Sequence, residues 1–256
     1  MTVIYQPKGR AREYATDAAN LYKTCPHGCA YCYVPTMPWG PSRYDFHKGS
    51  VPKKDIITQL RKEAPRLSPR QIHLCFTCDP YPCVRASGST VPQEITHEAV
   101  WTLKNAGHTV QILTKGGLDS TGDFSLLDEH DEYATTLTFS DAADSRLWEP
   151  HAALPADRIE ALKIAHSCGI TTWASLEPVV YPEQSFQMLI HALEAGVSKV
   201  KVGPLNYKGR LPKWLADTVP DDIDWKAFVE NVQELCRMWQ AECILKDDMK
   251  KLAGLD

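Results

Sequence analysis

Two periods of hydrophobic and polar positions alternate along the chain. Between residues 52 and 64 the apolar positions recur at helical spacing, as Ile56, Ile57 and Leu60 show. Short runs rich in apolar and β-branched residues are typical of strands. The predicted strands cover 71–76, 109–114, 133–139, 170–176, 198–202 and 242–246. The predicted helices cover 52–64, 92–106, 118–130, 155–168, 182–195 and 225–240.

Proline and glycine support these boundaries. Pro92 stands at the start of one predicted helix and Gly107 follows its end. This is the expected asymmetry, because proline fits the first helical turn and glycine fits the residue after the last. Gly169 and Gly196 end two further predicted helices in the same way.

Strand and helix alternate about six times, which predicts a parallel sheet with crossover helices. Either a closed or partial β/α barrel or an open doubly wound sheet fits the pattern. No linker interrupts it, so we expect one domain over residues 1–256, with 1–18 as an irregular lead-in. Prolines and glycines in 33–51 predict a lid-like loop without regular helix, and 208–224 is expected to be a surface loop.

Composition narrows the class of protein. The 256 residues are 43% hydrophobic and 23% charged, which is typical of a soluble globular protein. No apolar run is long enough to span a membrane, and the first residues lack the apolar core of a signal peptide. Nine cysteines without an export signal favour a reducing cytoplasm. A net charge of −4 argues against an electrostatic grip on long duplex nucleic acid, although a local basic groove would be compatible with it.

Three cysteines stand close together in the segment Cys25-Pro26-His27-Gly28-Cys29-Ala30-Tyr31-Cys32. Three thiols in one loop can hold three irons of a four-iron cluster and leave the fourth iron open to a small molecule. A structural zinc site is the alternative, and it needs a fourth ligand. His27 is poorly placed for that role, while Cys75, Cys78 and Cys83 could supply it or form a second metal site.

Polar residues follow the predicted strands. In parallel β/α folds the carboxyl ends of the strands meet at one side, so these residues predict a shared cavity. They include Thr77, Cys78, Asp79, Lys115, Thr136, Thr138, Ser140, Ser175, Glu177 and Asn206.

The cysteine loop resembles the CxxxCx-aromatic-C signature of radical S-adenosylmethionine (SAM) enzymes, including the aromatic Tyr31. Shorter pieces between about residues 20 and 250 resemble the branch related to spore photoproduct lyase. They are Thr77-Cys78-Asp79-Pro80-Tyr81, Leu113-Thr114-Lys115, Trp148-Glu149-Pro150 with Arg158, Glu177-Pro178-Val179-Val180, Gly203-Pro204-Leu205-Asn206 and Leu245-Lys246-Asp247-Asp248.

The resemblance implies a partial (β/α)6 TIM-like barrel and a [4Fe–4S] cluster on Cys25, Cys29 and Cys32. It implies that the open iron binds SAM and that a reductant of the flavodoxin or ferredoxin type supplies one electron. A 5′-deoxyadenosyl radical would then take hydrogen from a substrate. The SAM pocket implied by position consists of Tyr31, Thr77, Asp79, Lys115 and Thr138, with Asp79 facing the methionyl ammonium and Lys115 the carboxylate.

Some features depart from the lyase pattern. The usual Gly-Gly-Glu-type turn is replaced by Thr77-Cys78-Asp79-Pro80. The lyase also uses a cysteine of the second strand as hydrogen donor. Here Cys75 is a better candidate than Cys78 for that role, because a two-residue period puts Cys75 on the same strand face as Thr77 and Asp79. The alternative is that Cys75 is a small buried apolar residue. The substrate stays open between a nucleic-acid base, a peptide and a small molecule. The rival hypothesis is a non-catalytic protein that binds zinc or an iron–sulfur cluster.

Overall fold

The computed structural model describes residues 2–82 and 91–255. Cys83, a candidate ligand from the sequence, therefore lies outside the described residues. Within the described part of the chain, no helix has both the length and the apolar character needed to cross a membrane.

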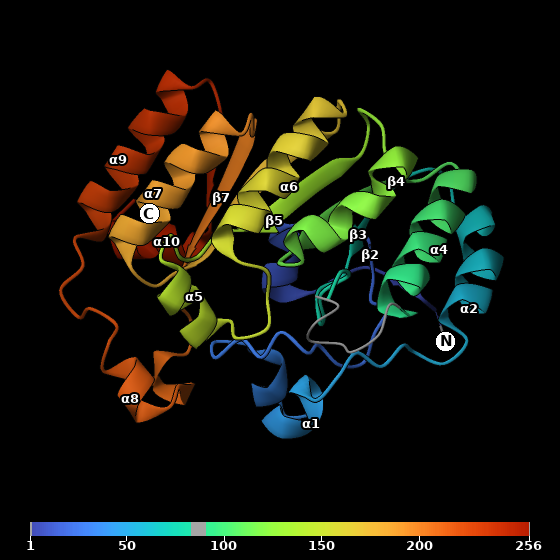
Figure 1. Ribbon diagram of the computed structural model, residues 1–256, viewed down its shortest axis with the longest axis horizontal. Coiled ribbons are helices and arrows are strands. Elements are labelled where there is room, and N and C mark those ends of the chain that lie inside the picture. Colours follow the sequence, from blue (N-terminus) through green and yellow to red (C-terminus); the bar gives the residue numbers. More distant parts are fainter. Residues whose placement is uncertain (1, 83–90, 256) are drawn as a thin grey trace.

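One sheet of eight strands in sequential order forms the centre of the molecule (Figure 1). The strands are β1 (Ile4–Tyr5), β2 (Ala18–Ala19), β3 (Gln71–Leu74), β4 (Thr109–Thr114), β5 (Glu132–Thr136), β6 (Thr171–Val179), β7 (Lys199–Pro204) and β8 (Glu242–Leu245). All neighbouring pairs are parallel except β1 and β2. Among the described residues nothing pairs β1 with β8, so the sheet is an unclosed, partial barrel. The predicted parallel α/β architecture is confirmed.

Helices cover one face of this sheet, and Figure 1 shows α4, α6, α7 and α9 in front of it. The helices that pack into the core are α2 (Ile56–Glu63), α4 (Val91–Asn105), α6 (Pro155–Ser167), α7 (Pro182–Glu194), α9 (Trp225–Met238) and α10 (Asp247–Ala253). Alternate strand residues such as Ile72, Val110 and Val200 are fully buried in one apolar core with these helices. The two-residue strand period therefore separates an apolar face from a polar one.

The segment predicted as a helix over 118–130 is instead a 3-10 helix, η4 (Gly117–Leu126). Two hydroxyls explain the tighter winding. Ser120 donates to the carbonyl of Gly117 and Thr121 donates to that of Leu118, so these side chains compete for the groups that an α-helix would use.

The expectation that 33–51 contains no regular helix is wrong. Helix α1 (Arg43–His47) fits between Pro41 and Gly49, and the Ser42 hydroxyl accepts a hydrogen bond from the N–H of Asp45. Short elements also occur at η2 (Val34–Thr36), η3 (Ala64–Arg66), α5 (Ala142–Trp148), η5 (Lys208–Arg210) and α8 (Lys213–Ala216). The last two lie in 208–224, where only a surface loop was expected.

The lead-in is also more ordered than predicted, because it contains β1 and the 3-10 helix η1 (Gly9–Glu13). Its dark-blue ribbon lies behind the sheet in Figure 1, on the side away from the large helices. Arg10 forms an ion pair with Asp248 at 2.7 Å, and the ammonium of Lys246 lies 3.4 Å from a carboxylate oxygen of Glu13. The segment thus reaches from the first strands of the sheet to the last.

Tyr14, which follows η1, packs among polar residues of the sheet's inner face. Its hydroxyl donates a short hydrogen bond to Glu177 and lies 3.2 Å from the hydroxyl of Ser175. The ammonium groups of Lys201 and Lys246 lie 4.5 and 4.1 Å from the centre of its ring. Ser175 and Glu177 therefore share one face, as the strand period predicts.

We expect the buried His73 to make stability fall in mild acid. Burial lowers the pKa of this imidazole from 6.5 to about 4, although a 2.8 Å hydrogen bond with Gln111 opposes the shift. The unfolded chain then binds more protons than the folded one between pH 6.5 and 4. His73 should therefore remove up to about 3 kcal/mol of unfolding free energy as the pH falls through this window. Urea unfolding of the wild type and His73→Gln at several pH values tests this, and equal pH slopes for the two proteins would refute it.

Candidate functional site

The cysteine loop begins after β2 and is fixed by backbone contacts on both sides. On one side the N–H of Cys25 donates to the carbonyl of Phe46 in α1 at 3.0 Å. On the other, the N–H of Ala30 donates to the carbonyl of Trp148 in α5 at 2.8 Å. Helices that the sequence pattern did not reveal therefore position the loop.

Gly28 allows the loop to turn against the segment after α5. Its φ of +72° is in the left-handed region that favours glycine. A Cβ at this position would lie 3.0 Å from Cγ of Pro150. The neighbouring N–H of His151 donates to the carbonyl of His27 at 3.1 Å. The glycine thus allows close approach as well as the turn.

The three thiols of the loop differ in exposure. Cys29 is buried, while Cys25 and Cys32 are half-buried. Burial raises the pKa of Cys29 to about 12, and it also raises the pKa of Cys25 and Cys32. Backbone hydrogen bonds from His27 to Cys25 and from Val34 to Cys32 act in the opposite direction, since they favour a charged sulfur.

The guanidinium of Arg43 fixes the outer side of the loop. It donates to the carbonyl of Cys29 at 3.1 Å and lies 3.5 Å from that of Cys32. His47 of the same helix has Nδ1 2.9 Å from the carbonyl of Cys25. Helix α1 thereby contacts all three cysteine residues through their backbone, which leaves their sulfur atoms available.

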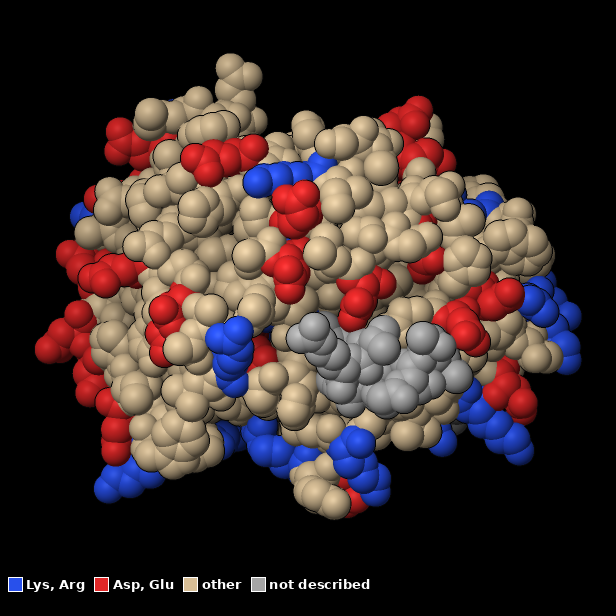
Figure 2. Space-filling model, viewed as in Figure 1, with Lys and Arg blue, Asp and Glu red and all other residues tan. Residues whose placement is uncertain are grey.

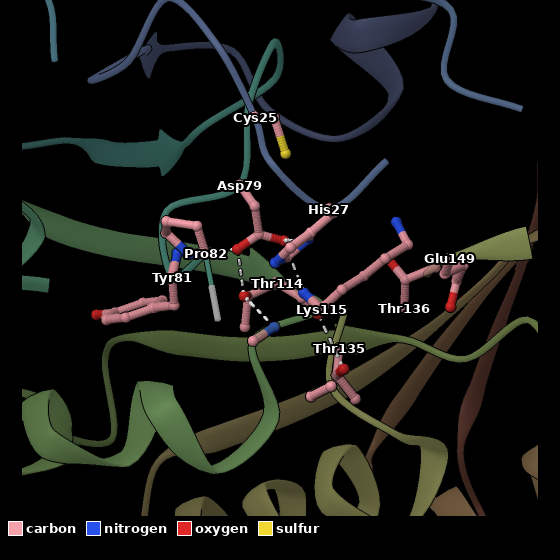
Figure 3. A network of polar contacts seen from close by, with 12 residues as sticks. Cys25, His27, Asp79, Tyr81, Pro82, Thr114, Lys115, Thr135, Thr136 and Glu149 are labelled. Atoms are coloured by element: carbon pink, nitrogen blue, oxygen red, sulfur yellow. Dashed lines mark hydrogen bonds and ion pairs between the residues drawn. The ribbon is translucent and has the colours of Figure 1, made fainter. Parts of the chain in front are cut away.

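Asp79 joins the loop to the ends of two strands (Figure 3). Its Oδ1 accepts hydrogen bonds from the N–H of Tyr81 at 2.8 Å and from the hydroxyl of Thr114 at 2.5 Å. Its Oδ2 accepts one from the N–H of Lys115 at 2.8 Å and lies 3.5 Å from Nδ1 of His27. An ionised carboxylate has about four acceptor positions, so the protein itself occupies those of Asp79.

Glu149 is a second buried carboxylate beside the loop. Oε1 accepts a short hydrogen bond from the hydroxyl of Tyr31, and the hydroxyl of Thr138 lies 3.4 Å from the same oxygen. Oε2 pairs with the guanidinium of Arg158. Burial alone would raise the pKa of Glu149, but Arg158 and then Lys115 hold that pKa below its ordinary value. The carboxylate is therefore kept ionised inside the protein.

Arg158 uses its remaining donors on the backbone. Nε donates to the carbonyl of Ala153 at 2.8 Å and Nη1 donates to that of Thr136 at 2.9 Å. A buried ion pair needs this kind of additional hydrogen bonding to offset the cost of removing both charges from water. The pair connects α6, the end of β5 and the aromatic residue of the cysteine loop.

The ammonium of Lys115 has a different environment. It lies 5.6 Å from the centre of the Tyr31 ring, and in the described part of the chain no carboxylate oxygen lies within 4.0 Å of it. Burial alone would lower the pKa of Lys115, but Cys29 and Glu149 raise that pKa above its ordinary value. A charged, half-buried ammonium without a close counterion is well suited to bind an anionic group.

The structure thus gathers Tyr31, Asp79, Lys115 and Thr138 around the cysteine loop. Thr77 lies at the exit of β3, where its N–H and that of Phe76 donate to the Asn20 side chain. Sequence reasoning gave no role to Asn20, since the backbone N–H groups that donate to its side chain leave no sequence signal. Glu149 and Arg158 appeared only as part of a resemblance.

Cys75 does not follow the strand alternation expected for it, because β3 ends at Leu74. Its sulfur accepts a hydrogen bond from the N–H of Leu21 at 3.4 Å, and the side chain is buried. Burial, and then the neighbouring Cys75 thiol, raise the pKa of Cys78 well above its ordinary value.

A sequence profile described as the Radical SAM superfamily matches residues 19–196, which is most of the chain. The chain belongs to the radical SAM superfamily. No curated protein sequence matches it.

Solved structures whose fold is similar to that of this chain include a spore photoproduct lyase and SuiB. A spore photoproduct lyase variant with bound AdoMet and dinucleoside spore photoproduct has a TM-score of 0.65 at 12% identity, covering 94% of this chain and 79% of the lyase. SuiB of Streptococcus suis bound to precursor peptide SuiA has a TM-score of 0.62 at 12% identity, covering 93% of this chain and 50% of SuiB. The chain therefore spans about half the length of SuiB, and both likenesses concern the fold.

The donor set of this radical SAM chain fits an iron–sulfur cluster, which the superfamily implies together with SAM. Three thiols stand in one loop, and helix α1 contacts that loop through the loop's backbone carbonyls rather than through the sulfur atoms. Within the described residues, no three His, Cys, Asp or Glu side chains are close enough to hold a single metal ion. A cluster does not need such convergence, because each cysteine binds its own iron.

We expect the Glu149–Arg158 pair to matter more for stability when only one partner is removed. Arg158→Met leaves a buried carboxylate uncompensated and should cost about 3–5 kcal/mol of unfolding free energy. The double variant Glu149→Leu with Arg158→Met removes both charges and should be more stable than Arg158→Met alone. Urea unfolding measures both, and a double variant no more stable than Arg158→Met would contradict this view of the pair.

Proposed function

We propose that this protein is a radical SAM enzyme that cleaves SAM reductively and uses the resulting radical to take a hydrogen atom from a substrate. Membership of the superfamily supports radical chemistry in general. The observation that carries the finer proposal is a half-buried ammonium, that of Lys115, next to a loop of three cysteines. These are the groups needed to hold the carboxylate of a zwitterionic amino-acid ligand beside a cluster.

Cys25, Cys29 and Cys32 would hold a [4Fe–4S] cluster. When bound, that cluster supplies one electron for the reductive cleavage of the SAM sulfonium, which releases a 5′-deoxyadenosyl radical. A one-electron reductant of the flavodoxin or ferredoxin type would act as its partner. The protein's own contribution is to fix the loop through α1 and the segment after α5, so that the thiols keep their positions.

Lys115 would bind the carboxylate of SAM, with Tyr31, Thr77 and Thr138 as further walls of the pocket. For Asp79 we propose a positioning role in place of direct contact with the methionyl ammonium. Its oxygens already accept from the backbone of Lys115 and from Thr114. Contact with the ammonium would require one of these hydrogen bonds to break.

A nucleic-acid base lesion and a peptide are the two substrate classes suggested by the structural relatives. One relative holds a dinucleoside spore photoproduct and another holds a precursor peptide. We propose hydrogen donation to a substrate radical as a role for Cys75. The closeness of the Cys78 thiol supports it, whereas the burial of Cys75 against Leu21 requires a local movement first.

Turnover is tested by anaerobic reconstitution with iron and sulfide, followed by dithionite and SAM. We expect the wild type to form 5′-deoxyadenosine and Cys29→Ala to form none, because one iron would lose its protein ligand. Chromatography of the nucleoside products gives the result. A colourless protein with bound zinc, or a cluster that never cleaves SAM, would instead favour a non-catalytic binding protein.

The role of Lys115 is tested by binding alone. Lys115→Met should weaken SAM binding about tenfold, because an ammonium–carboxylate interaction is lost from a partly desolvated site. Binding of 5′-methylthioadenosine, which lacks the amino-acid group, should change little. Calorimetry with the reconstituted protein measures both affinities. Equal losses for the two ligands would indicate a disturbed pocket and would contradict a contact between Lys115 and the carboxylate.

A further inference from the structure

Helix α1 places a cation against the outer side of the cysteine loop. The guanidinium of Arg43 donates a hydrogen bond to the carbonyl of Cys29 at 3.1 Å and lies 3.5 Å from the carbonyl of Cys32. Among the described residues no carboxylate oxygen lies within 4.0 Å of this guanidinium, and the nearest acidic residue in the sequence, Asp45, pairs instead with Lys48 at 2.9 Å. The charge of Arg43 is therefore directed at the backbone of two cysteines.

The start of α1 holds Arg43 in this place. The hydroxyl of Ser42 accepts a hydrogen bond from the N–H of Asp45 at 3.1 Å, which caps the helix one residue before Arg43. Phe46 is fully buried, and its carbonyl accepts a hydrogen bond from the N–H of Cys25 at 3.0 Å. The helix backbone is thus bonded to the same loop that Arg43 contacts. The guanidinium is therefore a fixed group of the site.

Little water can come between this cation and the third cysteine of the loop. Arg43 and Cys32 line one cavity together, and its volume is about 10 Å³, which is close to the space of a single water molecule. Bulk water screens charges strongly, whereas charges in a poorly hydrated part of a protein interact with much less screening. We therefore expect the positive charge of Arg43 to act strongly on the group that the thiols hold.

The region around α1 differs in charge from the protein as a whole, which has a net charge of −4. Figure 2 shows Lys and Arg gathered along the lower edge of the molecule, where Figure 1 places α1. Lys48 in this region is neutralised by Asp45, and the guanidinium of Arg210 donates to the hydroxyl of Thr36 at 2.8 Å. Arg43, by contrast, contacts the cysteine loop itself.

We propose that Arg43 is a positioning residue that sets the reduction potential of the cluster on the cysteine loop. This inference rests on the part of the proposed function in which Cys25, Cys29 and Cys32 hold that cluster. Reduction adds one electron, which the one-electron reductant supplies, and hence one negative charge at the loop. A fixed positive charge beside the loop stabilises the reduced form more than the oxidised form, so it raises the potential.

The chemistry of arginine suits this role. Its planar guanidinium can donate to two carbonyls at once, and it remains charged in proteins. A residue that only held the loop in shape would need the donors but not the charge. The two roles therefore make different predictions, because loss of the charge shifts the potential whereas loss of the fork disturbs the loop.

The experiment is an anaerobic redox titration of the reconstituted holoprotein, in which EPR spectroscopy measures the reduced cluster. Arg43→Gln removes the charge and keeps an amide that can donate to a carbonyl. At a given solution potential, this variant should lower the ratio of reduced to oxidised cluster about tenfold, which corresponds to a midpoint lower by about 59 mV for one electron. Its iron content should match that of the wild type.

Two further variants separate charge from structure. Arg43→Lys keeps the charge without the planar fork, so its midpoint should stay close to that of the wild type. Lys48→Gln is the matched control, because it removes one positive charge from the exposed end of the same helix, where solvent and salt screen it. Its midpoint should be unchanged. Equal shifts in Arg43→Gln and Lys48→Gln would indicate an effect of net charge and would contradict the proposal.

Iron content becomes the readout if Arg43→Gln takes up less iron than the wild type. Arg43→Lys must then restore the iron content, because it restores the charge beside the loop. Equal iron loss in both variants would refute a role for the charge and would leave Arg43 with the shape of the loop alone.

Failure of this inference can be told apart from failure of the proposed function. A cluster in Arg43→Gln with the wild-type midpoint would overturn the inference alone. A lowered midpoint in a protein that never cleaves SAM would refute the proposed function and support the role of Arg43. A wild type that binds zinc and forms no cluster would refute both.

Discussion

The site depends on the carboxylate of Asp79 more than on any other single group. It accepts hydrogen bonds from the exits of β3 and β4 and lies beside the imidazole of His27 in the cysteine loop. A carboxylate can be removed from water only when its acceptor positions are filled, and here they are filled by groups from three separate segments. The position of the Lys115 backbone, and with it the direction of the Lys115 side chain, follows from this arrangement. The cysteine loop is therefore coupled to the strand ends before any ligand binds.

A related constraint acts on the open side of the sheet. Parallel strands bury their outward residues under helices, but the inner face of an unclosed barrel has no second sheet to cover it. The lead-in supplies that cover through Tyr14, whose ring lies beside Lys201 and Lys246 and whose hydroxyl bonds to Glu177. Polar strand residues can then be buried with partners rather than exposed, as polar groups in a protein interior require. This explains why a segment without a strong pattern is ordered across the sheet.

The main architecture could be predicted because its physical cause is local. The helical and strand periods depend only on residues that are close together in the sequence, and so do Pro92 and Gly107 at the ends of one helix. The three cysteines also lie within one loop. The contacts that could not be predicted join residues far apart in sequence. Asn20 reaches the exit of β3, Tyr14 reaches β6, and Arg43 reaches carbonyls of the cysteine loop. The face assigned to Cys75 depended on a strand continuing past Leu74, and the turn toward Asp79 ends that strand earlier. Contacts between residues far apart in the sequence therefore set the limit of prediction, because no short sequence pattern encodes them.

The charges around the loop also explain which group is left for a ligand. Asp79 and Glu149 are both saturated by protein donors, and Arg158 is committed to Glu149 and to two backbone carbonyls. Lys115 differs from Asp79, Glu149 and Arg158. Its ammonium lies near the aromatic ring of Tyr31 and makes no ion pair with a described carboxylate. Burial acts in the opposite direction, but Cys29 and Glu149 raise the pKa of Lys115 above its ordinary value, so the ammonium stays protonated beside the cysteine loop. Among the described residues no carboxylate oxygen lies within 4.0 Å of this ammonium, so it can still meet an anionic group beside the three thiols.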